Sequence, residues 1–154
     1  MNKHKTLSHR TASSFVTFRL AKLQSSLNAQ ATAILKTKAG LSLVEWRLIQ
    51  TLRIFEDVTM SEIADFLQMD KGQLSRNVKA MLKKGLLRSE RYTEDKRVQH
   101  LYLTKAALEI SYRVMPVMET RQKFLLAEVA PDDLKIFYRI INKLESASKI
   151  REIE

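Results

Sequence analysis

The chain has 154 residues, 45% of them hydrophobic and 29% charged, and these proportions predict a globular protein rather than a disordered or low-complexity one. It has no cysteine, which excludes disulfide bonds and any metal or redox site built on cysteine. Its formal net charge of +10 favours a polyanionic partner such as nucleic acid.

Residues 1–40 predict a basic arm followed by a long helix. They hold seven lysine and arginine residues and no acidic residue. We expect the helix to begin between Thr11 and Ser14, because the apolar residues beyond this point recur at close to heptad spacing. These apolar residues are Val16, Leu20, Leu23, Leu27 and Ile34. We interpret the residues before the helix as a terminal arm, with a specific DNA contact as the alternative.

A second helix is expected from about Leu43 toward Phe55. Ser42 and Glu45 have the spacing of a capping box, in which each side chain bonds to the other residue's backbone amide. The apolar residues of this segment fall on one stripe, so the helix can support the segment that follows.

Residues 59–84 have the pattern of a helix-turn-helix. Thr59 and Asp70 are good N-cap residues, and each is followed three positions later by a residue that can bond back to the cap, Glu62 and Gln73 respectively. The two starts lie so close together that the turn between the helices can have only about three or four residues.

The second of these helices has an apolar face and an opposite cationic face. Its apolar residues are Leu74, Val78, Met81 and Leu82. Arg76 lies nearly opposite them, and its neighbours on that face are Gly72, Gln73, Lys79 and Lys83, with Ser75 at the margin. A cationic face without acids suits a helix that enters a DNA major groove, and an ordinary solvated face is the alternative.

A β-hairpin is expected directly after this helix. Two short runs, residues 86–92 and 98–103, flank a polar tip at residues 93–97. In the second run Leu101 and Leu103 point one way while His100 and Tyr102 point the other, as in a strand with one buried face. A hairpin after a helix-turn-helix is the arrangement called a wing.

Two further helices are expected in residues 105–154. Thr104 caps a helix that runs from Lys105 to about Val129, and Pro131 opens the last helix. The apolar face of the last helix is formed by Leu134, Phe137, Tyr138, Ile141 and Leu144. One small winged domain cannot bury these faces fully, so we expect them to pair with the first helix and with a second copy of the chain.

The chain resembles the MarR family of winged helix-turn-helix transcription regulators. The resemblance rests on Gly85-Leu86, Asp95-Lys96-Arg97 and Leu103-Thr104, which match the family's G-[LI] … D-x-R … L-T wing signature. It implies a mostly α fold with a small hairpin wing, dimerised through its N- and C-terminal helices. The parts would be residues 1–40 as arm and dimerisation helix, 41–104 as DNA-binding domain, and 105–154 as dimerisation helices.

The resemblance also implies roles for individual residues on double-stranded DNA. In the family the wing arginine reaches the minor groove and the acid two places earlier steadies it, which here gives Arg97 and Asp95, with Lys96 between them. A hairpin-tip ion pair of little energetic worth is the alternative. On the recognition helix we expect Arg76 and Gln73 at base edges. Ser75 and Lys79 are expected at phosphates, and Lys71 near the DNA backbone.

The family further implies a homodimeric repressor on a pseudopalindromic operator, released by a small and often anionic aromatic effector. No effector residue can be assigned from the sequence; the candidates are Trp46, His100, Arg19 and Arg47. Thiol-oxidation sensing, which a branch of the family uses, is excluded because the chain has no cysteine.

Other classes of function are less well supported. The three histidines form no metal-ligand pattern and no phosphate loop or nucleophile motif is present, so we expect no enzyme, no metal and no cofactor. No apolar run reaches the ~20 residues of a membrane span, and the start lacks the apolar core of a secretion signal, so we expect a cytoplasmic protein without membrane contact. The alternatives are a winged-helix protein-interaction module and a non-specific architectural DNA binder.

Overall fold

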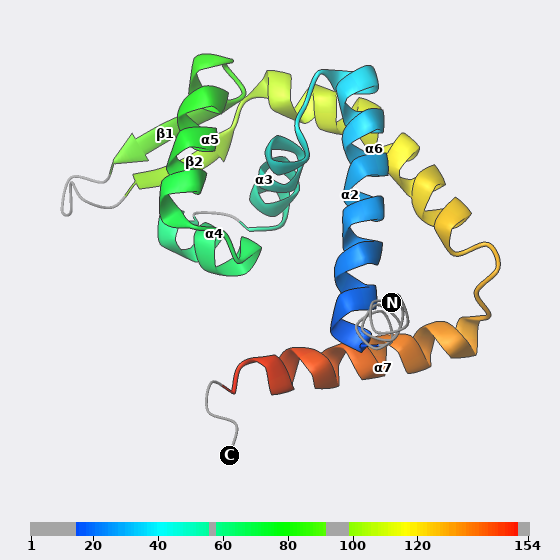
Figure 1. Ribbon diagram of the computed structural model, residues 1–154. Helices are drawn as coiled ribbons and strands as arrows, with labels where there is room; N and C mark the ends of the chain where they lie inside the picture. Colours follow the sequence, from blue (N-terminus) through cyan, green and yellow to red (C-terminus); the bar gives the residue numbers. More distant parts are fainter. Residues whose placement is uncertain (1–14, 56–57, 92–98, 151–154) are drawn as a thin grey trace, which may run out of the picture. The chain divides into compact units, whose positions relative to one another are not determined.

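Helices and one hairpin make up the computed structural model, which describes residues 15–55, 58–91 and 99–150, without the side chains of Arg91 and Gln99. The order is α2 (Val16–Ala39), α3 (Leu43–Ile54), α4 (Met60–Leu67), α5 (Lys71–Lys83), β1 (Leu87–Arg91), β2 (Gln99–Leu103), α6 (Lys105–Leu125) and α7 (Pro131–Ser148) (Figure 1). The predicted mostly α winged fold is confirmed. Contacts divide the chain into two units, Met1–Pro116 and Val117–Glu154, so the boundary falls within α6.

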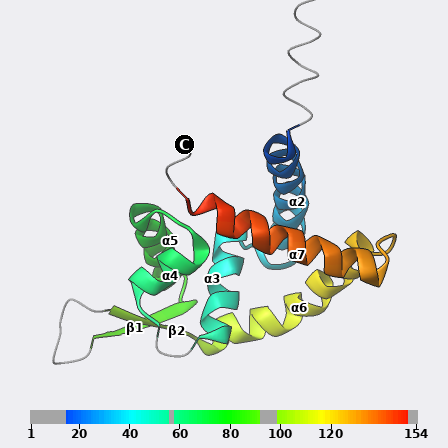
Figure 2. The same ribbon diagram turned by 90° about the horizontal axis from the view of Figure 1, so that it is seen from below.

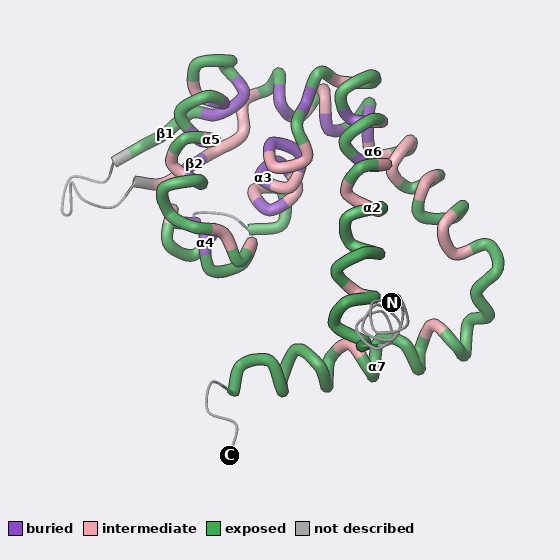
Figure 3. The backbone as a smooth tube through the Cα atoms, viewed as in Figure 1, coloured by how far each residue is buried: buried purple, intermediate pink, exposed green. Residues whose placement is uncertain are grey.

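The core of the first unit lies around α3, which packs against α2, α4, α5 and β2. Its fully buried side chains include Leu35, Leu48, Ile49, Ile63, Leu74, Met81 and Leu101, which come from five helices and strands. Figure 3 shows the buried positions concentrated in this winged part. Trp46 is buried among them, as expected of a core tryptophan.

The predicted helix starts are confirmed at α3 and α4. At both starts the cap hydroxyl accepts the backbone N–H of the glutamate three residues on, and that glutamate's carboxylate accepts the cap's own N–H. The caps are Ser42 and Thr59. At α5 one of the two capping bonds is present, because Asp70 Oδ1 accepts the N–H of Gln73 at 2.9 Å. The expected second bond, in which the Gln73 side chain accepts the N–H of Asp70, is not part of this cap.

A tight turn joins α4 to α5. Gln68 ends α4 in the left-handed region, with φ of 50°, and the N–H of Met69 donates to the carbonyl of Ala64 at 2.9 Å. Residues 68–70 therefore suffice to connect the helices, which matches the short turn expected of a helix-turn-helix. Figures 1 and 2 show α4 and α5 beside the hairpin.

The end of α5 explains why glycine begins the wing. Gly85 has φ of 68°, its N–H donates to the carbonyl of Leu82, and the N–H of Leu86 donates to the carbonyl of Met81, both at 3.0 Å. These two bonds define a Schellman motif. Thr104 then donates its hydroxyl to the Gly85 carbonyl at 2.7 Å and its N–H to the Leu86 carbonyl at 3.1 Å. The two ends of the wing are thus fastened to each other.

Replacing Gly85 with alanine is expected to lower the free energy of unfolding by about 1–2 kcal/mol, the cost of a left-handed residue with a side chain. A Cβ at this position would meet no atom within 4 Å, so the cost is conformational and not steric. Urea denaturation measures it. Gly85→Asn should lose less than Gly85→Ala, because asparagine tolerates this region better. Equal losses would contradict this explanation.

The wing strands are antiparallel, and Leu87 pairs with Leu103 while Ser89 pairs with Leu101. Leu87 and Leu101 are buried, so the predicted buried face is present. On the other face the Arg88 guanidinium lies 4.4 Å from the centre of the Tyr102 ring, its cross-strand partner, and Arg88 also forms an ion pair with Glu90. These pairs stiffen the base of the wing.

In the second unit, α6 ends at Leu125, four residues before the expected Val129. The chain tightens there, because the N–H of Val129 donates to the carbonyl of Leu126 three residues earlier. Pro131 then opens α7, and Asp132 and Asp133 occupy its first turn as expected. No residue of α7 is buried within the chain (Figure 3). Within the described residues, no helix combines the length and the apolar character needed to span a membrane.

Candidate nucleic-acid interface

The outer face of α5 is the candidate DNA-reading surface. The inner residues Leu74, Val78 and Met81 are buried, which fixes the opposite side of the helix toward solvent. The residues predicted for DNA contact lie on that solvent side: Lys71, Gln73, Arg76 and Lys79 are exposed, and Ser75 is half-buried. The helix carries four lysine or arginine residues and no acid. Its exposed side therefore offers cations and an amide to a polyanion.

The start of α5 is held by local bonds. The carboxylate of Asp70 accepts the N–H of Gln73, and the side-chain amide of Asn77 donates to the carbonyl of Gln73 at 2.8 Å. These bonds stabilise the first turn of α5, which begins at Lys71. Lys71, in this first turn, is exposed and is the cation that the helix start offers to a phosphate group.

The wing tip carries three of the residues predicted to contact DNA. Asp95, Lys96 and Arg97 lie outside the described residues, so their DNA contacts stay predictions. The two strands that lead into the tip are described, and Arg91 of β1 pairs with Gln99 of β2 at the end nearest the tip.

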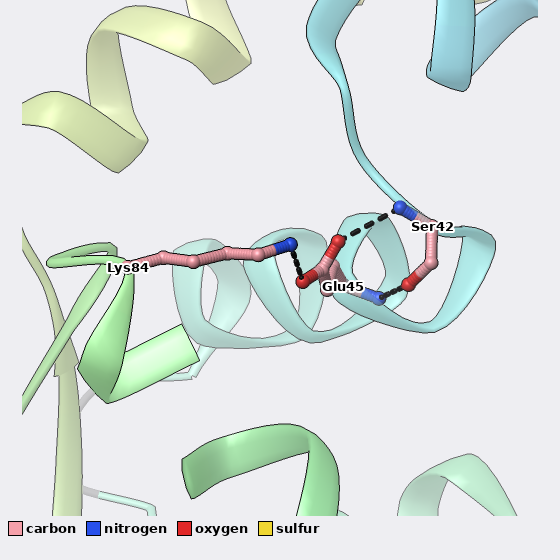
Figure 4. A network of polar contacts seen from close by, with 3 residues as sticks. All are labelled: Ser42, Glu45 and Lys84. Atoms are coloured by element: carbon pink, nitrogen blue, oxygen red, sulfur yellow. Dashed lines mark hydrogen bonds and ion pairs between the residues drawn. The ribbon is translucent and has the colours of Figure 1, made fainter. Parts of the chain in front are cut away.

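An ion pair between the buried Glu45 and the half-exposed Lys84 joins α3 to the end of α5 (Figure 4). Glu45 Oε1 lies 2.5 Å from Lys84 Nζ, and Glu45 Oε2 accepts the N–H of Ser42 at 2.8 Å. The Glu45 side chain is 6% exposed and that of Lys84 is 49% exposed. Burial raises the pKa of the Glu45 carboxyl, but the bonds from Lys84 and Ser42 outweigh it, and the net pKa is below its usual value. The sequence predicts the capping role of Glu45, whereas it contains no local signal for this partner.

This lowered pKa predicts a pH-dependent contribution to stability. A carboxyl whose pKa falls on folding stabilises the protein above its unfolded pKa, and loses this effect as pH falls through its folded pKa. Glu45→Gln keeps an acceptor for Ser42 and removes the charge. We expect it to lower the free energy of unfolding by roughly 1–2 kcal/mol at pH 7, the lower part of the range for a charged hydrogen bond, because the Lys84 partner is half exposed and screened by solvent.

Urea denaturation of the wild type and Glu45→Gln at several pH values tests this. The difference between the two proteins should shrink as pH falls below about 4, since the wild-type carboxyl is then increasingly protonated. Other carboxyl groups titrate in both proteins and cancel. A difference that does not change with pH would contradict the role of the charge.

The four candidate effector residues lie on three elements of the first unit, α2, α3 and β2. Trp46 is buried in the core, Arg47 donates to the side chain of Asn28 at 3.0 Å, Arg19 is exposed on α2, and His100 is half-buried in β2. A hollow of about 710 Å³ lies instead along α7, and none of the four lines it. Its lining residues are Lys135, Tyr138, Arg139, Asn142, Lys143 and Ser146.

Polar side chains also connect α3 to α6, which the sequence did not reveal. The hydroxyl of the buried Ser111 accepts from Gln50 Nε2 at 3.3 Å and from an Arg53 guanidinium nitrogen at 3.0 Å. The Arg53 guanidinium also lies 5.3 Å from the centre of the Tyr112 ring. These contacts fasten the helix after the wing to the support helix. Elsewhere, the described residues contain no cluster of three or more His, Asp or Glu residues suited to a metal ion.

Comparisons with known proteins agree with this geometry. A model of the MarR family matches residues 39–98, which include the helix-turn-helix and most of the wing. A MarR/EmrR family transcriptional regulator from Acinetobacter sp. ADP1 is similar in structure, with 26% identity and a TM-score of 0.80 over 86% of this chain and 94% of that one. No curated protein matches in sequence.

Two solved structures of complexes are similar in fold. A MarR family regulator from Streptomyces coelicolor, in complex with DNA, is 20% identical with a TM-score of 0.80 over 100% of this chain and 93% of that one. The PcaV regulator from Streptomyces coelicolor, in complex with its natural ligand, is 17% identical with a TM-score of 0.75 over 88% of this chain and 95% of that one.

Proposed function

The chain belongs to the MarR family of transcriptional regulators, which are not enzymes, and we propose that it is a homodimeric repressor that binds a pseudopalindromic operator. The acid-free outer face of α5 carries this proposal. A solvated helix face normally mixes both signs of charge, whereas this face offers only cations and polar groups. The DNA complex of the regulator from Streptomyces coelicolor, which has the same fold, supports double-stranded DNA as the partner.

The proposed contacts divide into two classes. Arg76 and Gln73, exposed near the middle and start of α5, read base edges in the major groove. Lys71, Ser75 and Lys79 contact phosphates and hold the register. At the wing, Arg97 enters the minor groove, steadied by Asp95 and accompanied by Lys96.

The exposed apolar side chains of α7 support dimerisation. Ile136, Phe137, Tyr138, Ile140 and Leu144 are all more than a third exposed within one chain. Five large apolar side chains exposed on one helix favour an interaction site over an ordinary solvated helix. A second copy of the chain would cover it, and a twofold dimer would present two α5 helices to half-sites one helical turn apart.

The effector belongs to the same proposal. The ligand complex of PcaV supports a small molecule as the signal, and the basic side chains of Arg19 and Arg47 favour an anionic one. An anionic aromatic compound would be attracted by these cations and could stack on an aromatic side chain. We place this regulation in the cytoplasm, together with the DNA.

Transcription in vitro tests the proposal. The template carries a duplex that the protein binds, placed so that it overlaps the promoter. Added protein should reduce the transcript, and benzoate, used as the probe for an anionic aromatic compound, should restore it. An increase in transcript would contradict repression, and a benzoate response equal to that of sodium chloride at the same ionic strength would contradict the effector class.

A further inference from the structure

Glu45 is the only charged residue that is buried among the described residues. Its partner, Lys84, lies at the end of the proposed recognition helix, 39 positions further along the chain. Burial of a carboxylate costs desolvation free energy, which the bond to a half-exposed lysine offsets only in part, so stability alone does not explain why a charge is buried here. Buried polar pairs are best attested where they fix the register of one element against another.

The Glu45 carboxylate is a rigid anchor. Its Oε2 accepts the N–H of Ser42 at 2.8 Å, while its own N–H donates to the Ser42 hydroxyl at 3.1 Å (Figure 4). Both bonds belong to the first turn of α3, which is itself packed in the core. These bonds fix the orientation of the carboxylate, and its remaining oxygen, Oε1, bonds Lys84 Nζ.

The end of α5 is held from two sides, because Thr104 bonds the carbonyls of Gly85 and Leu86 just beyond it and Glu45 bonds Lys84 from α3. Leu74, Val78 and Met81 pack an apolar stripe into the core, and apolar packing attracts without specifying an orientation. Asp70 fixes only the first turn. The charged hydrogen bond from the Glu45 carboxylate to Lys84 adds a directional contact between α3 and the end of α5, and such a contact opposes sliding and rotation of the helix.

We infer that Glu45 and Lys84 form a positioning pair that sets the angle at which α5 presents Arg76 and Gln73 to DNA. This inference rests on the proposed function. Glu45 is buried, so it does not contact DNA itself. It affects operator choice through its bond to Lys84. A small change in helix angle moves every base-reading side chain together, whereas phosphate contacts made by flexible lysines adapt to it.

The test compares wild-type protein with Glu45→Gln, Lys84→Met, the double variant and Lys84→Arg. Affinities are measured for the preferred operator duplex and for a scrambled duplex of the same length, over a range of salt concentrations. We expect each of the first two variants to lower the ratio of the two affinities by roughly tenfold. The double variant should lose no more than either single variant, because both remove the same bond. Lys84→Arg, which keeps the charge, should restore most of the ratio.

Three outcomes would overturn the inference. An unchanged ratio in Glu45→Gln, with a lower unfolding midpoint, would make the pair merely structural. If Lys84→Met weakens both duplexes alike and reduces the salt slope by about one, Lys84 is a phosphate contact instead. If the wild type does not discriminate between the duplexes, the proposed function fails and this inference fails with it. Circular dichroism at the assay temperature establishes that each variant is folded.

Discussion

Arg76→Ala is expected to weaken operator binding by roughly 1–3 kcal/mol for each half-site and to relax sequence preference at one position of that half-site. Arg76 is exposed opposite the buried stripe of α5, so its removal leaves the core intact. An arginine that bonds a guanine edge makes two hydrogen bonds that no other base offers in the same arrangement. Fluorescence anisotropy with a set of operators changed at single positions measures both effects.

Lys79→Ala is the matched control for Arg76→Ala. Lys79 lies on the same helix three residues further on, is also exposed, and carries the same charge. As a phosphate contact it should weaken all duplexes alike and flatten the dependence of affinity on salt, without changing sequence preference. If Arg76→Ala behaves in the same way as Lys79→Ala, Arg76 does not read a base.

Phe137→Glu is expected to convert the proposed dimer to a monomer and to lower operator affinity by roughly 10²–10⁴-fold, because the two half-sites are then bound independently. Phe137 is 45% exposed within one chain, and no residue of α7 is buried there. A charge at this position should therefore leave the winged unit folded, while its burial in a dimer interface is strongly unfavourable. Sedimentation equilibrium measures the mass, and anisotropy measures binding.

Asn142→Glu is the matched control for this second substitution. Asn142 is exposed on α7. Its replacement by glutamate adds the same negative charge as Phe137→Glu but removes no apolar side chain. The dimer should persist in this variant. Dissociation by both substitutions would point to repulsion of charge and not to burial of Phe137, and a dimeric Phe137→Glu would place the interface elsewhere.

Features that depend on neighbours a few residues apart could be predicted from the sequence. Ser42 and Thr59 were identified as caps because a capping box is complete within four residues, and both boxes are present. The two faces of α5 followed from helical periodicity, and Leu74 and Arg76 lie where that periodicity puts them. The glycine and threonine of the wing signature are explained by the bond between Gly85 and Thr104.

Features that depend on tertiary contacts could not be predicted. Lys84 is far from Glu45 in the chain, and a lysine at the end of a helix already has a sufficient local explanation in the helix dipole. The stacking of Arg88 on Tyr102 depends on the strand register, and the register depends on the turn geometry as well as on the alternation of apolar residues. The early end of α6 at Leu125 carries no glycine or proline as a local signal.

The roles of the individual DNA-binding residues depend on something that lies outside a single chain. Whether Arg76 or Gln73 faces a given base is decided by the docking angle of α5, which the dimer and the DNA set together. The sequence and the fold determine which face is offered. They leave the pairing of side chains with bases to be measured.

Selection of duplexes from a random pool by the purified protein at moderate salt, followed by sequencing, tests the central claim most directly. A dimer that reads DNA through two copies of α5 should enrich a twofold-symmetric motif whose half-site centres lie about one helical turn, 34–36 Å, apart. Retention of DNA without any enriched motif would contradict sequence-specific reading and indicate charge-driven, architectural binding. No retention at all would contradict DNA binding and make an interaction with another protein the leading explanation.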